Sequence, residues 1–412
     1  MLQTYTPRVT GPKLTASPTS AYRADVAIRG RPFGSSDDSW LAAAAELRAA
    51  RGQKGAKARE HLYEALGVAI DTLGDENIDA FVRREWRGER CYVEALAALV
   101  ALMEDEGAVH LTAVMLDDLL ATAAELSHLE RGRLLAMRAR VEWKLGRLDD
   151  AEERYQFIAS LARRDKTGEL ATRAELGFAA LAQLRGNMPA VREHAERVIA
   201  IAGKHKLAFL GRMAYHGITM VEAKAGRFPE AARAAWTALE LSRHDATAEA
   251  EALQVLGQTL LEGGQPALAR ASFAAVATRK VPARLILAAL GGLAVASARE
   301  SREPTVEWAV REVWRLRNSV GRTYQLSEAL YECALALALL GRSDESGTFR
   351  SAALAIAREE GYNELVFRIE AMAAPEVRHA PAALTDPSLV QSIAQLEPER
   401  LPKHVELEAA PA

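Results

Sequence analysis

The feature that most constrains the fold is a glycine or serine that returns at nearly constant intervals along most of the chain. Successive separations are 39, 40, 40, 38, 37 and 40 residues, and the markers are Gly107, Gly146, Gly186, Gly226, Gly264, Ser301 and Gly341. Five, nine and twelve residues after each marker lie three columns of mostly small or apolar residues. Those offsets differ by four and three, so each copy places three side chains on one stripe of a helix. The pattern predicts seven similar helical units.

Proline positions indicate that a helix begins just after the markers. Pro189, Pro229 and Pro304 follow their markers by three residues, and Pro266 follows by two. Proline suits the first turn of a helix, because the N–H there has no acceptor within the helix and the fixed φ is already helical. Each marker therefore falls in the turn between the first and the second helix of a pair.

The clearest copy runs from Ala250 to Val276. With leucine in place of both aromatics, the spacing W-x2-L-G-x2-Y followed by A-x3-F is met by Leu253, Leu256, Gly257, Leu260, Ala269 and Phe273. This pattern resembles the tetratricopeptide repeat (TPR), a helix-turn-helix unit. Gly257 and Ala269 leave little side chain where the two helices cross, so the helices can pack closely. The resemblance covers about 89–360, and the period exceeds the standard 34 residues by roughly five.

The copies are not equally regular. Glu142 and Glu222 take the place of the first-helix aromatic in two of them. The longer, degenerate repeats are similar to those in the sensor regions of large bacterial transcriptional activators. TPR proteins are mostly scaffolds that bind peptides or partner proteins in the concave groove lined by their first helices, and the resemblance implies the same here.

We therefore expect an all-α protein, a right-handed α-solenoid of stacked helix-turn-helix pairs that forms a TPR-like superhelix. One pair cannot bury its apolar face alone, so neighbours must stack on it. The 49% of apolar residues with only 6% aromatics favours close-packed helices. The expected divisions are an irregular or disordered arm at 1–36, an atypical helical cap at 37–90, about seven repeats at 91–360, a capping helix at 361–374 and an irregular proline-rich tail at 375–412. Within the tail, 388–396 has the pattern of a short amphipathic helix.

Charge and hydropathy bear on the compartment and the partners. The net charge of −3 provides no general attraction for nucleic acid or acidic lipid. No secretory signal is visible at the N-terminus, and the longest uncharged apolar run, 285–298, is shorter than the roughly 20 residues that span a bilayer. We expect a cytoplasmic protein that does not contact the membrane. The oligomeric state is not predicted.

Motifs for catalysis are missing from the sequence. It has no phosphate-binding G-x-x-x-x-G-K-[ST], no G-x-G-x-x-G, no G-x-S-x-G elbow, and no C-x-x-C or H-E-x-x-H metal motif. We therefore expect no enzyme, no catalytic residue, no cofactor and no metal. The preferred hypothesis is a scaffold or adaptor that binds a protein or peptide partner in the groove.

Groove-facing positions of the first helices can be projected from the marker spacing. The projected set is Arg133, Arg140, Trp143, Lys144, Arg173, Gln183, Met213, His216, Met220, Lys224, Gln254, Gln258 and Tyr331. Its earlier members are basic with an aromatic and two methionines, whereas the later positions are polar to acidic. This gradient suits an extended or helical peptide that has acidic and apolar residues at one end. The alternative is that these are ordinary solvated helix faces.

A second hypothesis is a regulatory sensor that acts on transcription through a small ligand, a signal peptide or a weak DNA contact. Arg29-Gly-Arg-Pro32 matches the core of an AT-hook, whose arginines lie in the minor groove of A·T-rich DNA. Few basic residues flank this core, so too few phosphate contacts are available to hold it on DNA. We do not expect nucleic-acid binding from the arm alone.

Overall fold

The structure is a computed structural model, and it describes residues 112–113, 116–117, 120, 127–243, 245–318, 320, 323–372, 384–398 and 400–405. All secondary structure in these residues is helical. The predicted arm, the cap at 37–90 and the first marker, Gly107, lie outside the described residues. The chain forms two compact units, divided after Lys166, and each is described by itself.

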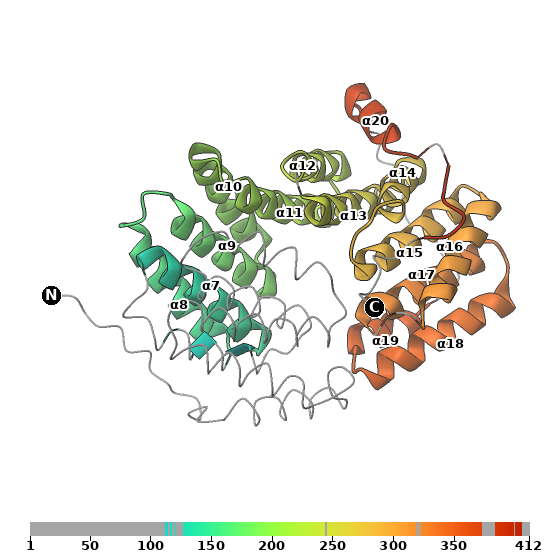
Figure 1. Ribbon diagram of the computed structural model, residues 1–412, viewed down its shortest axis with the longest axis horizontal. Helices are drawn as coiled ribbons and strands as arrows, with labels where there is room; N and C mark the ends of the chain where they lie inside the picture. The colour runs from blue at the N-terminus through green and yellow to red at the C-terminus, as the bar shows by residue number, and fades with distance from the viewer. Residues whose placement is uncertain are drawn as a thin grey trace, which may run out of the picture. The chain divides into compact units, whose positions relative to one another are not determined.

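Fourteen helices are described, and their labels follow Figure 1. The first unit contributes α7 (His128–Lys144) and α8 (Leu148–Ala162). The second unit, from Thr167 onward and called unit 2 below, contains α9 (Glu169–Leu184), α10 (Met188–His205), α11 (Ala208–Lys224), α12 (Phe228–Glu240), α13 (Ala246–Glu262), α14 (Pro266–Ala277), α15 (Ala283–Arg299), α16 (Glu303–Leu316), α17 (Tyr324–Leu339), α18 (Ser343–Glu359), α19 (Asn363–Glu370) and α20 (Pro387–Ala394).

Unit 2 is an α-solenoid of TPR-like helix pairs, as the repeat pattern predicts. The first helices are α9, α11, α13, α15 and α17, and the second helices are α10, α12, α14, α16 and α18. Each first helix contacts the first helix of the next pair, and each second helix contacts the first helices on either side of it. The helices therefore follow one another in a single file from α9 to α19 (Figure 1).

The markers have a conformational cause. Gly146, Gly186, Gly226, Gly264 and Gly341 have φ between +72° and +76°, the left-handed region that glycine enters without a Cβ penalty. Such a residue ends a helix and lets the chain turn back into the next one. Ser301 adopts the same left-handed conformation with φ +56°, so the turn is kept at this marker although the residue has a Cβ.

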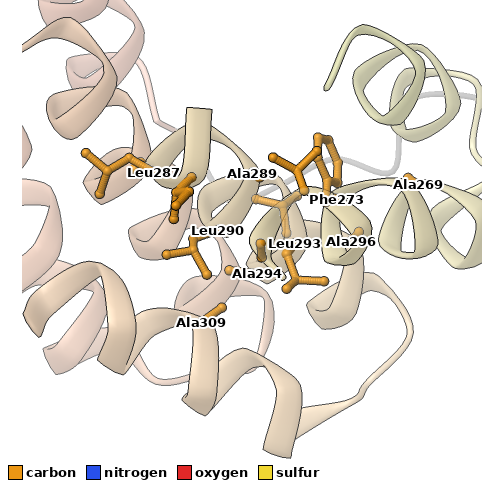
Figure 2. Close-up of a cluster of buried hydrophobic side chains, with 14 of the residues drawn as sticks. Ala269, Phe273, Leu287, Ala289, Leu290, Leu293, Ala294, Ala296 and Ala309 are labelled. Atoms are coloured by element: carbon orange, nitrogen blue, oxygen red, sulfur yellow. The ribbon is translucent and has the colours of Figure 1, made fainter. Parts of the chain in front are cut away.

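The predicted stripe of the second helices is the core of the array. All six described members of its last column, from Ile158 to Ala353, are fully buried. In the middle column Phe273 is 3% exposed, and its ring lies between two glycines: a Cβ at Gly257 of α13 would lie 2.7 Å from the ring, and one at Gly292 of α15 would lie 2.5 Å from it. Figure 2 shows this ring beside the apolar side chains of α15. The missing side chains on both neighbours are what let an aromatic fit between them.

The two irregular repeats replace the aromatic with a buried ion pair. Glu142 is 2% exposed and accepts hydrogen bonds from Nε of Arg154 on α8 at 2.7 Å, while Nη1 of Arg138 lies at 3.3 Å. Glu222 is 6% exposed and accepts from Arg192 and Arg227. Burial alone would raise the pKa of Glu222, but the two guanidinium groups outweigh it and lower that pKa. At Glu142 burial outweighs Arg154 and Arg138 and raises the pKa of the carboxyl. Both glutamates thus pair with arginines where the repeat pattern has an aromatic, and the pairing is the more effective one at Glu222.

After the last full pair, α19 packs on α18. The tail contains helix α20 at Pro387–Ala394, which overlaps the stretch 388–396 whose sequence indicates a short amphipathic helix, and this helix packs on α14. No described helix is long and apolar enough to cross a membrane.

Candidate functional site

The candidate site lies on the face of unit 2 formed by the first helices, called the first-helix face. Phe209, Met213 and His216 of α11 are spaced by four and three residues, so they share one stripe of this first helix. Gly217 borders the stripe and lies against α10, since a Cβ there would lie 3.8 Å from the Ala195 Cβ. We assign the stripe to the first-helix face because Phe209 and Met213 on it are exposed.

Two apolar side chains on this stripe are exposed. Phe209 is 55% exposed and Met213 is 37% exposed, and they are one turn apart. Beside them, Arg212 is only 7% exposed, and its guanidinium carbon lies 5.2 Å from the centroid of the Phe209 ring. The Arg212 guanidinium is thus buried beneath an aromatic ring that is itself largely exposed. Packing of the helix core does not explain this arrangement. We call Phe209, Arg212, Met213 and His216 the α11 patch.

The α11 patch contains buried nitrogens without partners. Arg212 uses Nη1 to donate to Oε2 of Glu251 at 3.0 Å, but its Nε has no hydrogen-bond partner among the described residues. The Nδ1 of His216, one turn further along, is also buried and unpartnered. Buried polar atoms are almost always hydrogen-bonded, so each exception calls for a water or a ligand to complete it.

The charge state of the patch follows from its surroundings. Burial, with the neighbouring Arg212 guanidinium, lowers the pKa of His216 to about 4, although Glu251 acts in the opposite direction. His216 is therefore neutral at pH 7. Its neutral ring carries one N–H, and Nδ1 can carry that proton and donate it.

The same face continues on α13 and α15 with polar links between repeats. Glu251 accepts from Arg212 of α11 and from Arg284 of α15, at 3.0 and 3.1 Å. The Gln254 amide donates to the Leu285 carbonyl, and Gln258 donates to Glu262 at 2.8 Å. The bonds of Glu251 and Gln254 join residues of neighbouring repeats and so connect three first helices, whereas the Gln258–Glu262 bond lies within α13.

A third group lies on α17 and α19. Nη1 of Arg368 donates to Glu328 at 2.9 Å and to the Tyr324 hydroxyl at 3.4 Å, and its guanidinium carbon lies 5.4 Å from the Tyr331 ring centroid. Burial raises the pKa of the Tyr331 hydroxyl, so it stays a neutral donor. Since Arg368 already occupies the space between these aromatic and acidic groups, this part of the face holds its own cation.

Glu332 has an unusual environment on the same helix. Its carboxyl lies directly over Gly291 of α15, where a side chain would collide with it. Burial, and the nearby Glu328 carboxylate, raise the pKa of Glu332 to about 8, while Arg368 opposes the shift. The group is therefore a neutral carboxylic acid at pH 7.

Stability is expected to depend on the Glu332 proton. The ordinary pKa of a glutamate is 4.5, and that of Glu332 in the folded protein is about 8. Between these two pH values the folded protein holds a proton that the unfolded chain has lost. The free energy of unfolding therefore falls as pH rises through this window. Glu332→Gln removes this titration. Urea midpoints measured at pH 5 and pH 8 should lie closer together in the variant than in the native protein. As a control, Glu364→Gln changes an exposed glutamate of α19 and should leave the difference between the two urea midpoints as it is in the native protein. If Glu332→Gln shows the same difference as the native protein, Glu332 is not the group that holds the proton.

The projected groove residues are distributed over the two units. Arg133, Arg140 and Trp143 are half-buried on α7, and Lys144 is exposed at its end, all in the first unit. The remaining members lie on first helices of unit 2 and have different surroundings: Arg173 pairs with Glu169 at 2.7 Å, Met220 packs against Ala182 and Val191, and Gln183 and Lys224 are exposed at helix ends. Met213 and His216 come together in the α11 patch, whereas Tyr331 lies in the α17 group. Groove function for this set stays a prediction.

Sequence projection missed the residues that complete the patch. Phe209 lies four residues before Met213 and so continues its stripe, a signal that was available. Arg212 is one position off the projected stripe, and its burial depends on Phe209 and on Glu251 of the next repeat. Arg29–Pro32, on which the DNA-contact hypothesis depends, lies outside the described residues. The described part holds no group of three or more His, Cys, Asp or Glu placed to hold a metal ion.

The paired helices and the face that their first helices form are those of a TPR-like helical-repeat protein. Two solved structures are similar: the apo form of the quorum sensor NprR from B. thuringiensis (14% identity, 72% of this chain and 80% of that chain, TM-score 0.46) and a signal transduction ATPase with numerous domains, with a tetratricopeptide repeat sensor, from Pyrococcus horikoshii (12% identity, 81% and 55%, TM-score 0.48). Both TM-scores lie below 0.5, so these are distant likenesses of fold alone. No family model and no curated protein matches the chain.

Proposed function

We propose that this chain is a non-catalytic binding protein that holds an extended peptide, or a segment of a partner protein, on the first-helix face of unit 2. The observation that carries the proposal is the α11 patch. It places exposed Phe209 and Met213 next to two buried nitrogens that lack hydrogen-bond partners in the described chain. A ligand that covers the apolar pair would remove the first anomaly, and it would remove the second where the Phe209 side chain moves aside and lets it accept from these nitrogens.

The patch indicates the chemistry of the ligand. An apolar side chain would cover Phe209 and Met213, because burying that surface is favourable by roughly 25 cal/mol per Å². A carboxylate or carbonyl oxygen beside it would accept from Nε of Arg212, and Nδ1 of His216 could supply a second donor. Hydrogen bonds between a guanidinium and a carboxylate are stronger than neutral ones, which favours an acidic residue or a chain terminus. A peptide that carries an apolar residue next to a carboxylate meets both conditions.

The proposal is tested by selecting peptides from a random 12-residue library on the intact chain. Enriched peptides should pair an apolar residue with an acidic residue or a free C-terminus. Their affinity should fall by about tenfold or more for Arg212→Ala, since loss of a charged hydrogen bond costs roughly 1.5–3 kcal/mol. Phe209→Ala should also weaken them, through the loss of apolar contact.

Leu184→Ala is the matched control, because Leu184 is an apolar side chain of the same unit that is 52% exposed but lies outside the patch. It should leave binding unchanged. If the selected peptides bind the Arg212 and Phe209 variants as tightly as the native chain, the first-helix site at α11 is wrong.

A further inference from the structure

The second-helix side of unit 2 carries a contact of a different kind, made with the C-terminal segment 384–405, called the strap. Its helix α20 packs on α14 through Leu389 and Ile393, which are 6% and 0% exposed. Just after this helix, Glu397 pairs with Arg270 of α14, whose Nε also donates to Glu300 at 2.6 Å. The strap then reaches α16.

On α16 the strap is held through its backbone. The Trp308 indole N–H donates to the Pro402 carbonyl at 2.8 Å, and Nη2 of Arg315 donates to the Val405 carbonyl at 2.6 Å. Between them, Oε2 of Glu312 accepts the Val405 N–H at 2.9 Å. The three side chains are spaced by four and three residues, so they form one stripe along α16. Three hydrogen bonds from one helix stripe to the main chain of a passing segment are a way of reading an extended peptide.

Two strap side chains add selectivity. The Val405 side chain is 3% exposed, so the stripe accommodates an apolar residue there. The Nδ1 of His404 lies 2.9 Å from Oε1 of Glu312. The Glu312 carboxylate is completely buried and shares its oxygens between Arg315 of its own helix and the strap. Burial would raise the pKa of Glu312, but these hydrogen bonds lower it, so the carboxylate is charged at pH 7.

The neighbouring helix α14, which the strap also contacts, has no such stripe. Counted from the marker, its matching positions are Ala271, Ala275 and Thr278, which carry no long hydrogen-bonding side chain. Leu389, Ile393 and Val405 of the strap are buried in the core cluster of unit 2, and Leu384, Val390, Leu396 and Leu401 pack against it. The last part of the strap, 400–405, is held differently: Val405 is its one buried side chain, and its other contacts with α16 are mainly hydrogen bonds to main-chain atoms, as in a bound peptide. Such an end segment opens with less free energy than a core element.

We infer that Trp308, Glu312 and Arg315 form a second peptide-recognition site, separate from the first-helix face, and that the strap is its ligand in cis. The site binds an extended segment by hydrogen bonds to the main chain of that segment, and it buries one β-branched side chain of the segment. A chain whose own strap is displaced binds the same segment of a second copy. The strap therefore controls access to the second-helix side of α16.

The test uses the full chain and a labelled peptide with the sequence of residues 396–407. Val405→Asp places a charge in the buried position and frees the site without altering α16. By fluorescence anisotropy this variant should bind the peptide at least about tenfold more tightly than the native chain, whose strap competes. Adding Glu312→Gln should abolish that gain, and a peptide that carries the same Val405→Asp change should not bind.

Hydrogen exchange on the same proteins provides the second measurement. In Val405→Asp, amide exchange should rise in 400–405 while α14, α15 and α16 stay protected. Equal peptide affinity for the native and Val405→Asp chains would overturn the inference. A rise in exchange that spreads through α14 to α16 would also overturn it, because the strap would then be part of the core. Neither result affects peptide binding at the α11 patch, so the two proposals fail separately.

Discussion

Phe273→Ala is expected to lower the free energy of unfolding of unit 2 by about 3–5 kcal/mol, the cost of removing a buried phenylalanine and leaving a cavity. The ring is 3% exposed and lies between Gly257 of α13 and Gly292 of α15, where the missing side chains leave room for it. Neither glycine has a side chain that could fill the space, so the site cannot collapse easily. Urea unfolding followed by circular dichroism measures the change.

Phe367→Ala is the control for this prediction. Phe367 is also a helical phenylalanine of unit 2, but it is 72% exposed, so its loss should change stability by less than about 1 kcal/mol. Equal effects of the two substitutions would mean that Phe273 does not occupy the close helix crossing described above.

Arg154→Met is expected to destabilise the α7–α8 pair by about 3 kcal/mol. The change removes the guanidinium that donates to both oxygens of Glu142 at 2.7 Å, and leaves a carboxylate that is 2% exposed with Arg138 as its remaining described partner. Breaking a buried pair from one side costs more than replacing both partners, because here a buried carboxylate is left with only the longer contact to Arg138. Hydrogen exchange of α7 and α8 reports this local loss.

The double variant Glu142→Leu, Arg154→Met should recover most of that stability, since leucine occupies the equivalent position of a regular repeat at Leu260. Arg358→Met serves as the control, because Arg358 and its partner Glu370 are 62% and 48% exposed, and an exposed pair contributes less than about 1 kcal/mol. If the double variant is no more stable than Arg154→Met alone, the ion pair is not a substitute for the repeat aromatic.

The helical repeat was predictable because its signals are local. A left-handed residue such as Gly226, a proline such as Pro229 in the next first turn, and a buried stripe such as Ala231, Ala235 and Ala238 all lie within about a dozen residues of one another. Each reports a backbone or packing requirement of one helix pair. The same logic identified Gly257 and Ala269 as the close crossing, although it did not show that Gly292 of the next repeat closes the other side of the Phe273 ring.

What could not be predicted depends on partners far apart in the sequence. Glu222 looked like a departure from the repeat, because one of the arginines that pair with it, Arg192, lies 30 residues away on the preceding second helix. Trp308 and Pro402 are 94 residues apart, and no periodicity connects a tail to the helix that binds it. The α11 patch shows the same limit: the stripe is visible in the sequence, whereas the burial of Arg212 depends on a residue from the next repeat.

Site-specific photo-crosslinking in cells tests the central claim, binding on the first-helix face, most directly. A photoreactive phenylalanine analogue at Met213 should crosslink to a discrete polypeptide, and Arg212→Ala should abolish that product. The same analogue at Arg233, exposed on second helix α12, should not capture it. A Met213 probe that captures nothing beyond the Arg233 background, or a product that persists in Arg212→Ala, would contradict the account.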